Sequence, residues 1–163
     1  PTHFNCSPDK IKDMHTDVFA GAADGSIKKY VFKGAKKGVF GEFKVDSFPE
    51  LAFARTIDTD PSVSNWLRPA ARQFELVYNG SHQYEPDFVV ETENDVYLVE
   101  IKRHDQVEDD DVKAKRERAV TYCQKATTWA KANGYKPWTH LFIPDNEVRP
   151  ERLLADYVKM FSC

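Results

Sequence analysis

The sequence predicts an α/β fold in which a mixed β-sheet is flanked by helices. Two strand-like segments joined by a short turn precede a long amphipathic segment, and a further strand-like segment and a helical pattern follow it. Segments whose apolar residues recur with the period of a helix, alternating along the chain with segments that have the pattern of a strand, are typical of a layered α/β domain. The length of 163 residues corresponds to one ordinary domain.

An irregular segment opens the chain. Residues 1–27 mix Gly, Asp, Ser and Pro without a period, so we expect a lead-in to a single domain over residues 28–163. The sequence starts with Pro1 and not with methionine, which favours a fragment of a larger protein. No run of about 18 apolar residues occurs, so no membrane-spanning helix is expected.

Two strands and two helices are expected next. The strands cover residues 27–32 and 39–45, where β-branched and aromatic residues gather. Ser47, a nearby proline and Glu50 predict a capped helix. A second cap-and-proline pair predicts another short helix over residues 60–67.

The middle of the sequence predicts three strands, and the last two form a hairpin. The strands are expected over residues 74–78, 87–91 and 96–103, with Asn94-Asp95 as the turn of the hairpin. The third strand has apolar residues on both faces, which is typical of a central strand covered on both sides.

A long helix, a strand and a last helix complete the pattern. An acidic run opens the long helix at residue 108 and Gly134 ends it, in accord with the helix dipole and with glycine beyond a helix end. Its apolar residues recur every three or four positions, so one face packs against the sheet. A strand over residues 137–143 and a helix that begins near Pro150 follow.

Composition and charge exclude several classes of protein. Hydrophobic residues make up 41% of the chain, which is enough for a core and excludes a mainly disordered segment. The 23 basic and 26 acidic residues give a formal net charge of −3, so nucleic-acid contacts would have to come from local basic patches. The widely spaced Cys6, Cys123 and Cys163 favour free thiols in a reducing compartment such as the cytoplasm.

Charged residues gather at one end of the predicted hairpin. Glu100 and Lys102 lie two positions apart on the third strand, so they share a face about 6.6 Å apart. Asp87 opens the preceding strand, and hairpin pairing brings it near the far end of the third strand. Two carboxylates and an ammonium are therefore expected to converge at one end of the sheet.

Such a cluster suits metal-assisted hydrolysis of a phosphodiester. Adjacent carboxylates repel each other unless a cation lies between them, and oxygen ligands select Mg²⁺ or Mn²⁺. A metal of this kind activates a water and polarises a phosphoryl oxygen, while Lys102 could orient the water or stabilise the phosphate. The alternative is structural, because an Asp after a proline often belongs to a turn and Glu-x-Lys is often a solvated pair.

Pro86-Asp87 and Glu100-Ile101-Lys102 together resemble the PD-(D/E)XK nuclease signature. Over residues 28–160 the chain resembles the C-terminal endonuclease region of type III restriction enzyme Res subunits and their helicase-linked relatives. The segments that carry this wider resemblance are residues 32–37, Asp46-Ser47 with Glu50, residues 63–69, residues 84–88, and Lys115 with Tyr122-Cys123.

The resemblance implies a restriction-endonuclease-like fold and Mg²⁺-dependent cleavage of double-stranded DNA. It implies that Asp87 and Glu100 are metal ligands, that Ile101 lends its backbone carbonyl, and that Lys102 is the catalytic lysine. Glu50 matches an acidic residue that holds the metal through water, although it also completes the capping box of its own helix.

Basic residues near the site are the expected DNA contacts. The candidates are Lys115, Arg103, Lys36 and Lys37, and a solvated helix start is the alternative interpretation of Lys115. No recognition-helix or zinc-finger pattern occurs, so phosphate contacts without base reading are expected. No Gly-x-x-x-x-Gly-Lys loop occurs either, so no ATP site is expected in this chain.

The same resemblance implies partners in a bacterial, cytoplasmic restriction-modification system. These are an upstream helicase or translocase domain and a separate methyltransferase subunit that modifies the DNA. The alternative function is a non-catalytic DNA-binding or docking module of a helicase-linked protein with the same fold. A small hydrolase of another class finds no support, because no nucleophile elbow or Ser-His-Asp spacing occurs.

Overall fold

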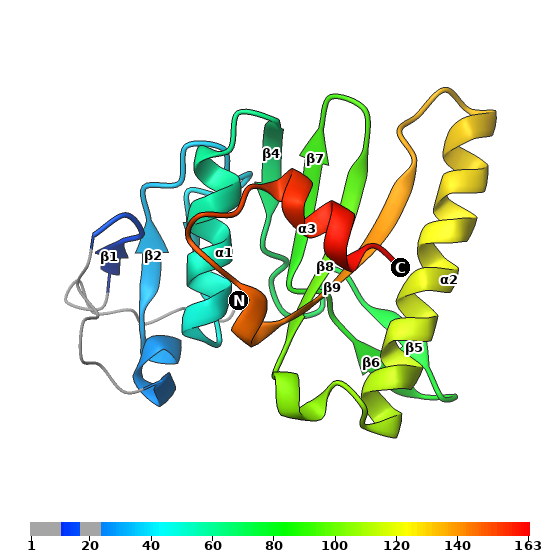
Figure 1. The fold of residues 1–163 in the computed structure, drawn as a ribbon, viewed down its shortest axis with the longest axis horizontal. Coiled ribbons are helices and arrows are strands. Elements are labelled where there is room, and N and C mark those ends of the chain that lie inside the picture. The colour runs from blue at the N-terminus through cyan, green and yellow to red at the C-terminus, as the bar shows by residue number, and fades with distance from the viewer. Residues whose placement is uncertain (1–10, 17–23) are drawn as a thin grey trace.

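The computed structural model describes residues 11–16 and 24–163. Its central sheet has four strands, which lie in the order β4, β7, β8 and β9 (Figure 1). Neighbours are antiparallel except for β8 and β9, which run parallel, so the sheet is mixed as predicted. The strands are β4 (Val63–Leu67), β7 (Phe88–Thr92), β8 (Val96–Lys102) and β9 (Trp138–Pro144).

Helices cover both faces of this sheet. α1 (Phe48–Thr59) and α3 (Leu154–Phe161) pack into the main core, whereas α2 (Asp110–Ala132) packs into a second cluster on the other face. Val99 of β8 points into the main core and its neighbour Leu98 points toward α2. The predicted double cover of this strand is confirmed, and α1, the β7–β8 hairpin and α2 all lie within a few residues of their predicted positions.

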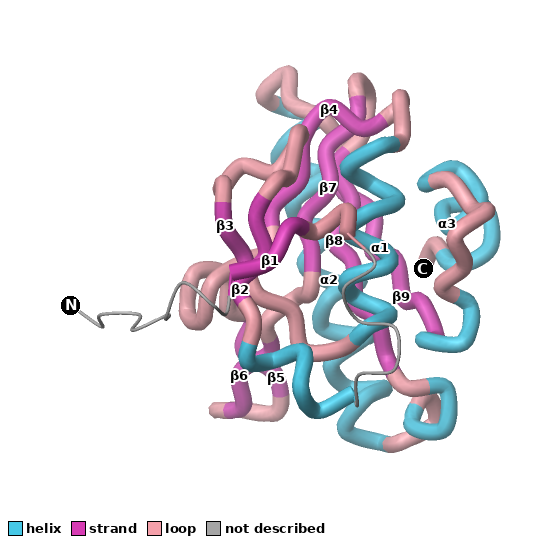
Figure 2. Tube along the Cα trace, turned by 90° about the vertical axis from the view of Figure 1, so that its left-hand side faces the viewer, coloured by secondary structure: helices cyan, strands magenta, loops and turns pink. Residues whose placement is uncertain are grey.

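Two smaller sheets flank the central one, as the side view shows (Figure 2). The β5–β6 hairpin lies beside the first turns of α2, and its turn places Asn79 and Gly80 at φ values of 44° and 85°. Because Tyr78 pairs with His82, the loop has three residues, and backbone of positive φ is typical of such short hairpin loops. The strands of the small sheets are β1 (Ile11–Asp13), β2 (Val31–Lys33) and β3 (Glu42–Phe43), and β5 (Leu76–Tyr78) and β6 (His82–Tyr84).

The predicted short helix over residues 60–67 is wrong, because residues 63–67 form β4. Trp66 is buried in the main core and pairs with Val90 of β7, so tertiary packing decides the conformation of this β-branched and aromatic segment. Asp60 does not start a helix but ends α1, since its N–H donates to the Thr56 carbonyl.

The first strand predictions are right only in part. Residues 24–29 form a 3₁₀ helix, and the strand begins only at Val31, because Ile27 and Val31 are both buried at the spacing of a helical turn. Of residues 39–45, only Glu42–Phe43 pairs in a sheet, since Val39 and Phe40 are exposed.

Part of the expected lead-in packs into the main core. β1 pairs with β2, and Met14 is fully buried. The remaining lead-in residues, 1–10 and 17–23, lie outside the described residues, and Cys6 is among them. Cys123 is buried and Cys163 is exposed, and both are free thiols. Within the described ranges, no helix has the length and apolar character needed to cross a bilayer.

Candidate metal and catalytic site

The β7–β8 hairpin brings Asp87 and Glu100 to the same end of the sheet. Phe88 pairs with Val99, so Asp87 lies opposite Glu100 one step further along the hairpin. Two backbone contacts fix Asp87 there. Its N–H donates to the Val99 carbonyl at 2.9 Å, and its Oδ2 accepts the Ile101 N–H at 2.7 Å.

Glu100 is held in an environment that disfavours its charge. Burial and the neighbouring charge of Asp87 raise the pKa of Glu100 well above its usual range, although Tyr84 and the ammonium of Lys102 oppose that shift. The charge of Asp87 beside the buried Glu100 therefore disfavours a second negative charge at this end of the sheet.

Lys102 ends β8 on the same face as Glu100. Its charge acts on Glu100, but no side chain of the described ranges forms a close ion pair with its ammonium. The ammonium is therefore available to a ligand that approaches this end of the sheet.

Glu50 reaches the same region from the first turn of α1. It completes the predicted capping box, since its N–H donates to Ser47 Oγ at 3.4 Å and Ser47 Oγ donates to its Oε1 at 3.0 Å. The side chain is nonetheless deeply buried, and burial together with the charge of Asp87 raises the pKa of Glu50 to about 7. Glu50 is thus both a cap and a buried acid of the site.

Arg68 is the site residue to which the sequence alone assigned no role. Its Nη1 lies 2.6 Å from Asp87 Oδ1, and its Nη2 lies 2.8 Å from Glu50 Oε2. The side chain is only 11% exposed and covers the Phe88 ring, with 5.4 Å from the guanidinium carbon to the ring centre. Burial lowers the pKa of Arg68, but the charges of Asp87 and Glu50 outweigh this and leave it above its ordinary value.

The two expected DNA contacts nearest the site differ in their surroundings. Lys115 forms an ion pair with Asp111 at 2.8 Å, and its charge is also close enough to Glu100 to oppose the rise in that pKa. Arg103 is exposed and pairs with Asp105 at 2.6 Å. Both residues belong to the same end of the sheet as Asp87.

Lys36 and Lys37 lie at the other end of α1. Their N–H groups donate to the carboxylate of Asp58 at 2.8–3.0 Å. The Lys37 ammonium donates to the carbonyls of Asp60 and Val63, which ties it to the start of β4. The structure therefore does not bring these two lysines to the Asp87 site.

The donor set fits an oxygen-ligated cation. Within the described ranges, no three Asp, Glu, His or Cys side chains are close enough together to coordinate one metal ion. Arg68 lies between Glu50 and Asp87 and forms ion pairs with both. Arg68 is shared among Asp87, Glu50 and Asp46, while Lys102 and Lys115 act on Glu100, and Glu50 and Glu100 still have raised pKa values. A divalent cation beside Asp87 and Glu100 would supply the missing positive charge.

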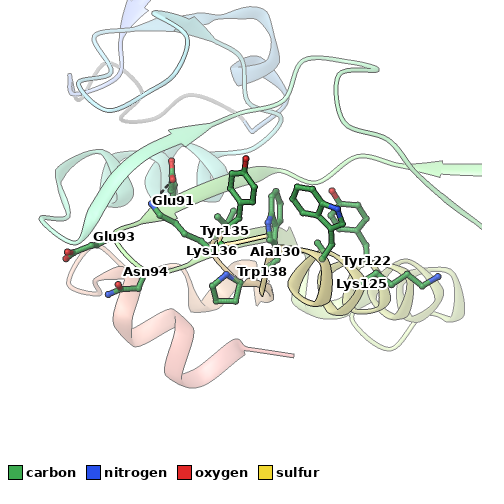
Figure 3. A pocket seen from close by; sticks show the side chains of 14 residues that line it. Glu91, Glu93, Asn94, Tyr122, Lys125, Ala130, Tyr135, Lys136 and Trp138 are labelled. Atoms are coloured by element: carbon green, nitrogen blue, oxygen red, sulfur yellow. Dashed lines mark hydrogen bonds and ion pairs between the residues drawn. The ribbon is translucent and has the colours of Figure 1, made fainter. Parts of the chain in front are cut away.

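A hollow of about 860 Å³ lies at the end of the sheet opposite the Asp87 site (Figure 3). Its walls include the exposed rings of Trp129 and Tyr135, which stack with centres 5.3 Å apart. Val96, the first residue of β8, also lines it, so the length of β8 separates this hollow from Lys102 by roughly 20 Å. It is a separate feature from the Asp87 site.

Neither a scan against models of protein families nor a search of curated proteins found a match to this chain. The function therefore has to be inferred from the residues of the site.

Proposed function

We propose that the chain is a Mg²⁺-dependent endonuclease domain of restriction-endonuclease-like fold, which hydrolyses phosphodiester bonds of double-stranded DNA. The observation that supports this most strongly is the pairing of Asp87 with Glu100 at the end of a doubly covered strand, with Lys102 beside them. Charged side chains at the end of a buried strand are costly unless they have a use.

Each residue of the site has a distinct part in this proposal. Asp87 and Glu100 would hold the metal through carboxylate oxygens. The N–H of Ile101 already faces Asp87, and in an extended strand the carbonyl of the same residue points to the same side, where it offers a third oxygen. Glu50 lies beyond Arg68, so its contribution would pass through water.

Bound there, Mg²⁺ or Mn²⁺ supplies an activated water and polarises the scissile phosphate. Lys102 contributes an ammonium with no close carboxylate partner in the described structure, placed to stabilise charge on the phosphate. Lys115 and Arg103 are the proposed contacts to neighbouring phosphates, whereas Lys36 and Lys37 are left out because of their positions.

The parent system is part of the same proposal. The sequence resemblance points to the cleavage module of a type III restriction enzyme, with an upstream helicase or translocase and a methyltransferase subunit in the bacterial cytoplasm. The chain would then be the cutting part of a larger machine, and it is expected to cut weakly or indiscriminately when detached.

One observation favours a second candidate function. Arg68 already neutralises Asp87 and Glu50 without a metal, as a purely structural cluster of ion pairs would. A non-catalytic DNA-binding or docking module of a helicase-linked protein could keep such a cluster for stability alone.

Plasmid cleavage separates the two candidates. Supercoiled plasmid is incubated with Mg²⁺ or Mn²⁺ and the wild type, Lys102→Ala, or the matched control Lys125→Ala, whose exposed side chain lies near the far end of α2. Cutting by the wild type and the control, but not by Lys102→Ala, supports the nuclease. Plasmid binding without cutting by all three proteins supports the non-catalytic module, and equal cutting by all three removes Lys102 from the site.

A further inference from the structure

A small, partly enclosed hollow lies beside Glu100, on the face of the sheet that α2 covers. Its volume is about 10 Å³, close to the roughly 10–15 Å³ that one water needs by the same measure and far too small for a phosphate. The residues around it are Tyr84, Glu100, Lys102, Val112, Lys115, Arg116, His140 and Phe142.

Two residues that line this hollow each have a buried polar atom that forms no hydrogen bond of ordinary length, although the Tyr84 hydroxyl is close enough to Glu100 to affect its pKa. The two atoms are the hydroxyl of Tyr84 and Nε2 of His140, in residues that are 4% and 1% exposed. Within the described ranges they are the buried side-chain nitrogen and oxygen atoms without such a hydrogen bond, and both residues line this one hollow. A buried polar atom that stays unpaired destabilises the fold, so a shared partner is strongly favoured.

The proton positions on His140 follow from its other ring nitrogen. Nδ1 lies 2.9 Å from the Leu98 carbonyl oxygen, which can only accept, so Nδ1 carries the proton. Burial lowers the pKa of His140 to about 4, so the ring is neutral at pH 7. Nε2 of His140 is therefore an acceptor and the Tyr84 hydroxyl can donate, and both residues line the hollow.

A single water satisfies every group with the correct polarity. It accepts the hydrogen of the Tyr84 hydroxyl and donates one of its own hydrogens to His140 Nε2. Its second hydrogen is left for the carboxylate of Glu100, which lines the same hollow. Three hydrogen bonds are typical of a buried water.

We infer that the hollow binds one ordered water that joins Tyr84 and His140 to the Glu100 carboxylate, and that Tyr84 and His140 are positioning residues for Glu100. The water site itself depends only on the geometry of the hollow. The positioning role in metal binding rests on the proposed function, since Glu100 is there a metal ligand. Loss of a group that hydrogen-bonds to a metal ligand commonly weakens metal affinity by about 10–100-fold.

The water site is tested by a crystal structure of the chain at a resolution that shows ordered waters. The expected result is one water peak within hydrogen-bond distance of Tyr84 Oη, His140 Nε2 and a Glu100 oxygen. An empty hollow, or a direct hydrogen bond between Tyr84 and Glu100 in its place, would overturn the inference.

The positioning role is tested by the affinity of the chain for Mn²⁺ alone, measured by calorimetry. Tyr84→Phe removes the hydroxyl, and His140→Asn keeps an amide for the Leu98 carbonyl but has no acceptor at the position of Nε2. Each variant is expected to bind Mn²⁺ about 10–100-fold more weakly, and the matched control Tyr122→Phe, at the edge of the same apolar cluster, is expected to bind like the wild type.

The double variant gives a readout that a loss of packing would not give. Because Tyr84 and His140 act through one water, removing both should weaken Mn²⁺ binding about as much as removing either one. Additive losses, or single variants with unchanged affinity, would overturn the positioning role while a wild type that binds Mn²⁺ leaves the proposed function standing. A wild type that binds no Mn²⁺ would overturn both, and the water peak would still decide whether the hollow is a water site.

Discussion

Glu50 makes the stability of this fold depend on pH. Its side chain is buried, and burial raises its pKa to about 7 from an ordinary value of 4.5. An acid with a raised pKa holds its proton more tightly in the folded chain than in the unfolded chain. The stability that this proton contributes is fully present below pH 4.5 and is lost as the pH rises through 7.

The size of this effect follows from the two pKa values. The difference between about 7 and 4.5 corresponds to roughly 3 kcal/mol in full, most of which is lost between pH 5 and pH 8. Glu50→Gln removes the ionisation but keeps one oxygen that can accept the N–H of Asp46, as Oε2 does, and its amide NH₂ takes the place of Oε1 and can donate to Ser47 Oγ. Relative to the wild type, the variant should therefore gain stability on the order of 2–3 kcal/mol over this pH range.

Urea unfolding at pH 5 and pH 8 measures this gain. Other groups, such as His140 with its pKa lowered to about 4, titrate in both proteins and cancel in the difference. The matched control is Glu117→Gln, which makes the same change at an exposed position of α2 and should follow the wild type at both pH values. If the stabilities of wild type and Glu50→Gln change in parallel with pH, the burial argument for Glu50 is refuted.

Four further predictions concern the site, the C-terminal end of α1 and DNA binding. Arg68→Met removes the cation between Asp87 and Glu50 and should cost about 3–5 kcal/mol in urea unfolding at pH 8; a cost below about 1 kcal/mol would mean that these ion pairs add little. Asp58→Asn weakens the hydrogen bonds that the Asp58 carboxylate accepts from the N–H groups of Lys36 and Lys37 and from Trp66 Nε1. The variant should lose about 1–3 kcal/mol of stability, and faster amide hydrogen exchange at residues 36 and 37 would confirm the cause. Glu50→Gln should keep the helix cap and weaken Mg²⁺-dependent plasmid cleavage, and full cleavage would remove Glu50 from the site. Plasmid binding should weaken about tenfold or more between roughly 50 and 200 mM salt if two phosphates are neutralised, and an affinity independent of salt in a filter-binding titration would contradict backbone contact.

The elements that the sequence predicted best are those whose local pattern agrees with their packing. β8 has apolar residues on both faces, and the core covers both faces, so its local sequence and its packing agree. α1 begins where Ser47 and Glu50 form a complete cap. The β7–β8 hairpin fixes its own register through a short turn, which is why Asp87 and Glu100 could be expected to lie together.

Contacts between distant parts of the sequence explain the segment that was mispredicted. Asp60 has the sequence context of a helix cap, but its carboxylate binds the N–H of Leu154 at 2.7 Å and the hydroxyl of Ser62 at 2.7 Å. The Leu154 contact spans 94 positions of the chain and leaves no local trace. Val63 and Trp66 then join the sheet because β7 offers them a pairing edge and a core to fill.

Arg68 escaped sequence reasoning for the same reason, and its position changes how the site has to work. The pairing of Trp66 with Val90 sets Arg68 beside Phe88 and hence beside Asp87, from a strand that was predicted as a helix. One oxygen of Asp87 accepts from Arg68 and the other accepts from the Ile101 N–H, so neither oxygen is idle. A metal that uses Asp87 must therefore share this carboxylate with the guanidinium or displace it. Since Arg68 keeps Glu50 as a second partner, it can turn toward Glu50 without becoming an unpaired buried charge, and the Arg68–Glu50 pair is then what lets Asp87 change partners.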